Sequence, residues 1–160
     1  MLDIELKNKF FIFVKNCGGG WNEKDKLLLK QQLKFGWDIG NTTPNRSVIQ
    51  KGDKALLYIS GKNAQIFVGE IELNSEVYAP TEKLRRKYFT LPLVMSSEYW
   101  VDVAKFSFWD DPIPIRKVLP KLSFVKNKNN FGVYLLGGVT HIPENDYNQV
   151  LKSIKTLKHK

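Results

Sequence analysis

Four tryptophans and a small set of polar side chains give this chain its clearest chemistry, which is the binding of a flat, polar ring. Recognition of one nucleobase requires aromatic walls for stacking, a few polar groups for the base edge and positive charge outside for the backbone. Each stacked base contributes ~1–3 kcal/mol, comparable with the cost of extruding it from a duplex. The candidate walls are Trp21, Trp37 and Trp100, and the candidate readers of the base edge are Asn16, Asp38 and Ser60.

Core packing is the alternative explanation for each tryptophan. It is strongest for Trp100 and Trp109, because both lie in a long apolar strand pattern. It is weaker for Trp37, which we expect in a polar loop beside a sheet edge, where an indole is rarely needed for packing alone. The surroundings of Trp37 are therefore the predicted binding site.

The charge balance favours a polyanionic partner. The 160-residue chain has 25 Lys and Arg residues against 16 Asp and Glu residues, a formal net charge of +9 that favours nucleic acid through counterion release. A solvated Lys-rich surface explains the charge equally well, but aromatic residues form 12% of the chain, and stacking surfaces on a basic domain suit unpaired bases. The candidate phosphate contacts are Arg46, Lys83, Arg85, Arg86, Lys87, Lys126 and Lys128.

Residues for catalysis are scarce. Cys17 and His141 would serve as nucleophile and base only if the fold brought them together, and an inert thiol with a structural histidine is the simpler interpretation. With one cysteine and two histidines, we predict no catalysis, no metal and no cofactor. We predict a cytoplasmic protein without a membrane partner. The chain has a single cysteine, no apolar run approaching the ~18 residues of a membrane span, and no signal-peptide pattern.

The stretch from Phe10 to Tyr78 organises the predicted fold. An apolar strand over 10–14 is followed by a helix over 22–34, which has a capping pattern at its start and Gly36 at its end. Strands over 55–60 and 65–73 form a hairpin that must lie beside the first strand to bury a shared face. In the second of these strands, alternation places Phe67, Gly69, Ile71 and Leu73 on one face.

The second half is less regular. Residues 81–88 form a basic helix or loop, and 99–109 predict a central strand that Asp110-Asp111-Pro112 ends. Pro114 and Pro120 favour short helical turns, and 122–143 reads as a loop between apolar segments. An amphipathic helix follows Pro143. We also expect an arm or edge strand over 1–8, an irregular connector over 91–97, and one domain covering 1–160.

The order of these segments resembles the EVE domain family, a branch of the PUA-like superfamily close to the YTH domains. The resemblance is carried by the first strand ending in Lys15-Asn16, by Gly36-Trp37 after the first helix, and by KGDKALLYISG, FVGEIELNSEVY and FVKNKNNFGVYLLGGVTHIPENDY. It implies an α+β fold, a PUA-like curved mixed β-sheet or β-barrel flanked by helices. This chain departs from the family pattern at Asp38, where relatives have small or hydroxyl residues after the tryptophan.

The resemblance also implies a pocket for one modified base flipped out of nucleic acid. Trp37 corresponds to a wall of the aromatic cage and Asn16 to a base contact, with Tyr58 and Trp100 as further pocket residues. Related domains form the recognition module of McrB-type restriction enzymes, so a fused or associated AAA+ motor or nuclease is a candidate partner.

The leading hypothesis is a non-catalytic module that binds a methylated base, with DNA favoured as the partner. An RNA-binding PUA-like domain is one alternative, because contact with a 2′-hydroxyl leaves no local sequence signature. A small-molecule-binding protein or enzyme that uses the same pocket is the other.

Overall fold

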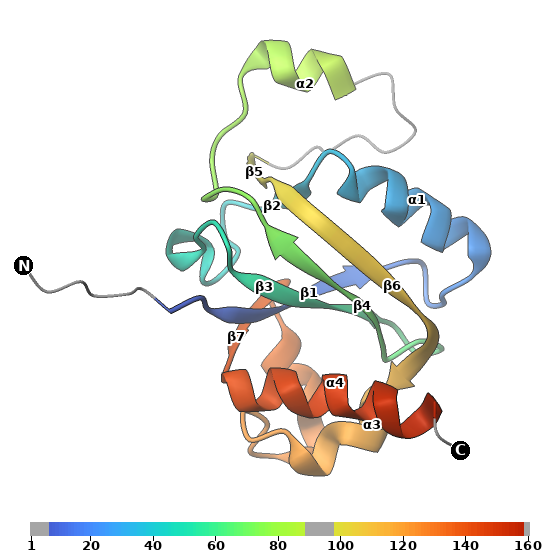
Figure 1. Cartoon of the computed structure of the whole chain (residues 1–160). Coiled ribbons are helices and arrows are strands. Elements are labelled where there is room, and N and C mark those ends of the chain that lie inside the picture. Colours follow the sequence, from blue (N-terminus) through green and yellow to red (C-terminus); the bar gives the residue numbers. More distant parts are fainter. Residues whose placement is uncertain (1–6, 89–97, 159–160) are drawn as a thin grey trace, which may run out of the picture.

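A curved five-stranded mixed sheet is the largest element of the computed structural model, which describes residues 7–88 and 98–158 (Figure 1). Its strands are β1 (Phe10–Asn16), β3 (Lys54–Ser60), β4 (Ile66–Leu73), β6 (Val103–Pro114) and β7 (Val139–Ile142), in the order β6-β4-β3-β1-β7. β1 pairs with β3 in parallel, and the other neighbours pair antiparallel. The first strand therefore lies beside the hairpin, as predicted.

A second, two-stranded sheet consists of β2 (Trp37–Ile39) and β5 (Tyr99–Val101). The two sheets are connected, because β5 leads into β6 through Asp102 and the main chain of Tyr78 bonds to that of Trp100. Together with the flanking helices this is the α+β arrangement, a curved mixed sheet flanked by helices, that was predicted.

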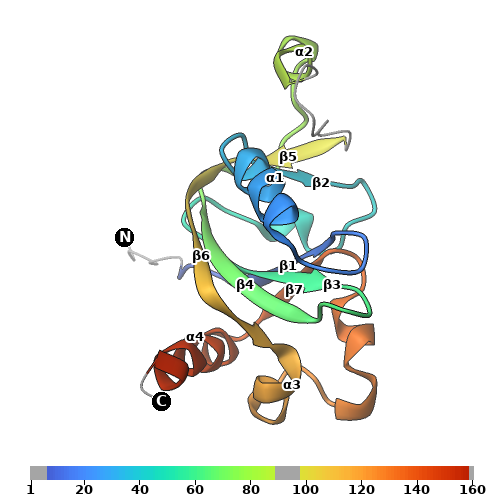
Figure 2. The ribbon, with the colours of Figure 1, turned by 90° about the vertical axis from the view of Figure 1, so that its right-hand side faces the viewer.

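Helices cover both faces of the five-stranded sheet (Figure 2). α1 (Glu23–Leu33) packs on one face, whereas α3 (Ile115–Val118) and α4 (Glu144–Lys158) pack on the other. Strand alternation separates the two cores, with Phe11 and Phe13 facing α1 and Ile12 facing the opposite side. The short helix α2 (Glu82–Tyr88) projects from the body (Figure 1), and the 3₁₀ segments are η1 (Arg46–Val48), η2 (Leu119–Lys121) and η3 (Lys128–Leu135).

The predicted capping box at the start of α1 is present. The Asn22 side chain accepts a hydrogen bond from the Asp25 main-chain N–H at 2.9 Å, and the Asp25 carboxylate accepts one from the Asn22 N–H at 3.0 Å. At the other end Gly36 has a φ of 134°, and a Cβ there would lie 2.5 Å from the Val101 carbonyl oxygen. The chain can therefore turn closely past β5 and place β2 beside it.

Replacing Asn22 with alanine should lower the free energy of unfolding by about 1 kcal/mol, because the Asp25 N–H in the first turn of α1 loses its side-chain acceptor. Urea denaturation monitored by circular dichroism measures this change. Asn148→Ala on the exposed side of α4 is the matched control and should change the midpoint little. Equal shifts for the two variants would contradict a capping role.

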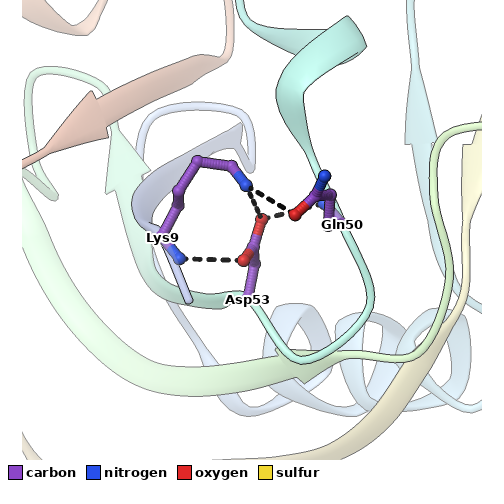
Figure 3. Close-up of polar contacts among 3 residues, drawn as sticks. All are labelled: Lys9, Gln50 and Asp53. Carbon is purple, nitrogen blue, oxygen red and sulfur yellow. Dashed lines mark hydrogen bonds and ion pairs between the residues drawn. The ribbon is translucent and has the colours of Figure 1, made fainter. Parts of the chain in front are cut away.

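The Asp53 carboxylate links the chain before β1 to the chain before β3 through hydrogen bonds and an ion pair (Figure 3). Its Oδ1 accepts a hydrogen bond from the Lys9 N–H and its Oδ2 accepts one from the Gln50 N–H, both at 2.8 Å. Lys9 Nζ lies 3.3 Å from Asp53 Oδ2 and also donates to Gln50 Oε1 at 3.2 Å. The KGDK segment therefore has a structural role, since its carboxylate is 1% exposed and holds two main-chain donors.

The expectation of one central strand over 99–109 is wrong. The segment changes sheets at Asp102, and β6 is an edge strand in which every residue except the buried Ile113 is exposed or partly buried. Asp110-Asp111-Pro112 does not end it, because β6 continues to Pro114, although its register with β4 jumps between Phe108 and Ile113. The apolar residues of β6 are instead covered locally, for example by Trp21, whose ring lies 5.9 Å from that of Phe108.

Simple alternation also fails in β4. The register with β3 shifts between Leu57 and Tyr58, with Val68 as the extra residue of a bulge. Because one extra residue reverses the faces beyond it, Val68 lies with Ile71 in the core under α1, whereas Phe67 belongs to the opposite core.

The stretch over 122–143 is more ordered than expected, since it contains η3 and β7. The short helical turns after Pro114 and the helix after Pro143 are confirmed as α3, η2 and α4. The predicted arm over 1–8 falls largely outside the described residues, and the predicted connector over 91–97 falls wholly outside them.

Candidate nucleic-acid interface

A cavity of about 250 Å³ opens where β1 ends, between β2 and the start of β7. Three of the predicted pocket residues, Asn16, Trp37 and Asp38, line it together. Lys15, Thr43 and Gly138 also contribute to its wall. The fold therefore brings Asn16, which lies at the end of β1, together with the consecutive residues Trp37 and Asp38 of β2.

Trp37 forms part of both the cavity and the core. The expectation that it lies in a polar loop is wrong, because it belongs to β2 and is 4% exposed. Its ring packs against Phe13 with centroids 5.4 Å apart, and Lys15 Nζ lies 5.8 Å from the indole centroid, within range of a cation–π contact. The indole is thus held in place by its neighbours, and only a small part of its surface is accessible from the cavity side.

A chain of hydrogen bonds leads from β1 through α1 to the Asp38 carboxylate. Lys15 Nζ donates to Gln32 Oε1 at 2.9 Å, and Gln32 Nε2 donates to Asp38 Oδ1 at 2.9 Å. Gln32 is 4% exposed, on the buried side of α1. Sequence analysis did not identify Gln32 or Lys15, although a glutamine at a core-facing helical position three residues after Leu29 is a usable signal for a buried polar network.

The edge of β1 provides main-chain groups at the cavity. The Val14 N–H donates to the Gly138 carbonyl oxygen at 2.8 Å, which is where the contact between β1 and the chain leading into β7 ends. Main-chain groups alternate along a strand, so the N–H and C=O of Asn16 are directed to the same edge, at the cavity. The Asn16 side chain accepts a hydrogen bond from the Gly18 N–H at 2.9 Å and shapes the turn after β1.

The remaining predicted pocket residues lie elsewhere. Trp21 packs on β6, and Trp100 is buried beneath the Arg85 guanidinium, 5.7 Å from its ring. Tyr58 and Ser60 line a neighbouring cavity of about 460 Å³, which shares Val14 and Gly138 with the first. Burial raises the pKa of Tyr58 to about 12, the nearby Arg116 opposing this only in part, so its phenol stays protonated at neutral pH.

The predicted phosphate contacts fall into separate groups. Lys83, Arg86 and Lys87 are exposed on α2, which projects from the body (Figure 1), and Lys126 is exposed in the stretch between η2 and η3. Three others have contacts within the protein: Arg85 donates to the Glu98 carbonyl, Lys128 donates to the Leu122 carbonyl, and Arg46 stacks on Tyr99 at 4.4 Å. These groups lie on separate segments, and Lys15 is the Lys or Arg residue that lines the cavity itself.

The structure keeps Cys17 and His141 apart. His141 in β7 is opposite Phe11, near the start of β1, whereas Cys17 follows the other end of that strand. Burial, followed by the negative charge of Asp25, raises the pKa of the Cys17 thiol, which makes it less reactive. Among residues 7–88 and 98–158, no group of three His, Cys, Asp or Glu side chains is arranged to hold a metal ion. No helix in those ranges has the length and apolar character of a membrane span.

Comparison of the sequence with known families finds a match to the EVE domain over residues 21–153. A UPF0310 protein of Pyrococcus abyssi is 26% identical over 109 residues, which cover 64% of this chain and 73% of that protein.

Solved structures share the fold at low identity. Human THYN1, solved in complex with DNA containing 5-methylcytosine, has a TM-score of 0.60 and 14% identity, covering 92% of this chain and 98% of that one. The N-terminal domain of Thermococcus gammatolerans McrB, bound to m5C DNA, has a TM-score of 0.55 and 14% identity, covering 94% and 99%. The YTH domain of Zygosaccharomyces rouxii MRB1, in complex with N6-methyladenosine RNA, has a TM-score of 0.56 and 15% identity, covering 97% and 89%.

Proposed function

Because the chain belongs to the EVE domain family, we propose that it is a non-catalytic module that holds one modified base of a nucleic acid in the cavity beside Trp37. The observation that carries this proposal is that Trp37, Asp38 and Asn16 line one cavity. An aromatic surface, a carboxylate and a main-chain edge are the three kinds of group that recognition of a single base requires. We treat residues 1–160 as one domain with this role.

In this proposal, stacking on the base contributes affinity, whereas hydrogen bonds to the base edge contribute specificity. The Trp37 indole provides ~1–3 kcal/mol of stacking, with little dependence on the identity of the base. Asp38 and the main chain of Asn16 supply directional hydrogen bonds to the base edge. A methyl group on the base adds apolar contact, and modification also lowers the cost of unpairing the base.

DNA is the favoured partner. Two of the structural neighbours described above were solved with methylated DNA and one with methylated RNA, and the basic surface of this chain suits either polymer. The likeness to an McrB N-terminal domain makes association with a restriction motor a further part of the proposal. RNA binding is the second candidate function.

Fluorescence anisotropy with matched DNA and RNA strands tests the proposal. Duplexes and single strands carry one unmodified base, one N6-methyladenine or one 5-methylcytosine, at two salt concentrations. We expect a several-fold preference for one modified strand. Salt-sensitive binding without preference would reduce the protein to a general nucleic-acid binder, and absence of binding would favour a small-molecule ligand.

The triple variant Lys83→Ala, Arg86→Ala and Lys87→Ala removes three exposed charges from α2. It should lower the affinity for modified and for unmodified DNA by the same factor. Each lost phosphate contact should flatten the slope of log K against log salt concentration by ~0.9. The matched control replaces the exposed residues Lys24 and Lys30 of α1 and Lys34 at its C-cap, and causes the same change in net charge. Equal effects of the two triple variants would show that net charge matters and that α2 makes no phosphate contact.

A further inference from the structure

We propose that Leu136 is a wedge that fills the place of the modified base in a DNA duplex while that base occupies the cavity beside Trp37. This inference rests on the proposed function and narrows its ligand from nucleic acid in general to double-stranded DNA. It assigns a role to the loop between η3 and β7, residues 136–138, which we call the wedge loop.

Leu136 is an apolar side chain whose position is not explained by packing. It is 71% exposed, more than any other large apolar residue in the ranges 7–88 and 98–158. The residue before it, Leu135, is 6% exposed and belongs to the core formed with α3 and α4. Single apolar residues are common on protein surfaces. Exposure alone therefore assigns no role, and the location of Leu136 has to be considered.

Leu136 lies at the rim of the candidate site. It lines the cavity of about 460 Å³, which shares Val14 and Gly138 with the cavity beside Trp37. Gly138 is two residues after Leu136, so their Cα atoms are at most about 7 Å apart. That distance corresponds to about two base steps of a duplex, which rise ~3.4 Å each. Neither cavity is lined by the other exposed large apolar residues, which are Leu27, Val48 and Val133.

The wedge loop is held in place at two points. The Gly138 carbonyl oxygen accepts a hydrogen bond from the Val14 N–H at 2.8 Å, which attaches the loop to β1. A Cβ at Gly137 would lie 2.6 Å from the Pro44 ring, so the loop also packs closely against the chain before η1. A side chain that replaces a base is most effective on such a restrained backbone, because ordering a flexible loop would cost binding free energy.

A wedge contributes to the binding of a duplex and not to that of a single strand. Extrusion of a base leaves a gap between neighbours that have lost their stacking partner, and proteins that distort DNA insert apolar side chains such as leucine between base steps. Full burial of a leucine side chain corresponds to about 10- to 100-fold in affinity. The bases of a single strand are already unpaired, so binding one of them leaves no gap in a duplex to fill.

The surroundings of Leu136 favour DNA over a protein partner. Lys62 is exposed and lines the same cavity as Leu136, and a lysine beside the gap can contact the phosphate of a flanking nucleotide. The formal net charge of +9 favours the same polyanion. Docking of a protein on Leu136 is the alternative, and it predicts that replacing Leu136 leaves the affinity for DNA unchanged.

The test compares Leu136→Ala with the full, unaltered chain on a DNA duplex and on the corresponding single strand. Each probe carries one 5-methylcytosine or one N6-methyladenine, and fluorescence anisotropy at fixed salt gives the dissociation constants. We expect the affinity for the modified duplex to fall about 10-fold and that for the single strand to change by less than about twofold. Leu136→Met keeps an apolar side chain of similar volume and should retain the duplex affinity within about twofold.

Val133→Ala is the matched control, because Val133 is 53% exposed on η3 and lines neither cavity. It should leave the affinities for duplex and single strand unchanged. Since Leu136 and Val133 are both exposed, their replacement should alter the unfolding temperature little. Thermal unfolding checks that each variant is folded.

Equal loss of duplex and single-strand affinity in Leu136→Ala would make Leu136 an ordinary contact of the bound strand and would overturn the wedge. Unchanged duplex affinity would overturn it too, as would a full chain that binds modified single strands and no duplex. Each of these outcomes leaves the proposed function standing. Failure of the full chain to prefer any modified strand would instead overturn the proposed function.

Discussion

Replacing Trp37 with leucine is expected to abolish the preference for a modified base and to weaken binding of the modified strand by about 10- to 100-fold. The variant removes the aromatic surface on which the base stacks, and such stacking contributes ~1–3 kcal/mol. Leucine is chosen because the indole packs on Phe13 in the core. Alanine would leave a cavity costing about 3–5 kcal/mol of stability and would confuse unfolding with loss of the site.

Fluorescence anisotropy at fixed salt measures this effect on modified and unmodified strands of one sequence. Trp21→Leu is the matched control, because that indole lies on Phe108 of β6 and away from the cavity. The control should keep its preference. Preference retained in Trp37→Leu but lost in Trp21→Leu would place the site on the β6 surface.

Replacing Asp53 with alanine is expected to lower the free energy of unfolding by about 2–4 kcal/mol. The main-chain N–H groups of Lys9 and Gln50 lose their acceptor in a buried position, and the Lys9 ammonium loses its counter-charge. The effect should appear as a lower urea midpoint with an unchanged m-value, since the surface exposed on unfolding remains similar.

Asp111→Ala removes an exposed carboxylate and is the control for Asp53→Ala. Its midpoint should remain close to that of the unaltered protein. A shift for Asp53→Ala no larger than that of the control would mean that the join between β1 and β3 does not depend on this carboxylate.

Short sequence patterns predicted the elements whose ends are set by residues close to them in the sequence. The Asn22 to Asp25 spacing located the start of α1, and Gly36 located its end. The apolar runs of β1 and β3 were equally clear, because strands buried on both faces are largely apolar. β4 was recognisable from its apolar residues and from the alternation at Glu70 and Glu72. Their order in the sheet followed from the need to cover a shared apolar face.

Features that depend on contacts across the sheet were not predictable in this way. The bulge at Val68 exchanges the faces of neighbouring residues. Gly69 lies beside it, but a glycine in a strand does not tell which residue is the extra one. The segment over 99–114 is apolar enough for a central strand. Its change from one sheet to the other at Asp102 depends on contacts with residues distant in the sequence.

The candidate site shows the same division. Trp37 and Asn16 were predicted from residue type and from the family resemblance, and they line one cavity. The predicted environment of Trp37 was wrong because its sequence neighbours are polar. They gave no indication that its ring packs on Phe13. Gln32 was missed because only the fold brings a core-facing residue of α1 against β2.

The cavity beside Trp37 is lined partly by strands of the packed sheets and partly by two loops. Most of its lining residues belong to β1 and β2, with Val139 from β7, whereas Thr43 comes from one loop and Gly138 from another. A side chain at Gly137 would meet the Pro44 ring at 2.6 Å, so the two loops touch and have to change together. Loops accept insertions that a packed sheet does not. Exchanging both loops as one unit is therefore a route by which evolution or protein engineering can adapt this fold to new bases while its core stays constant.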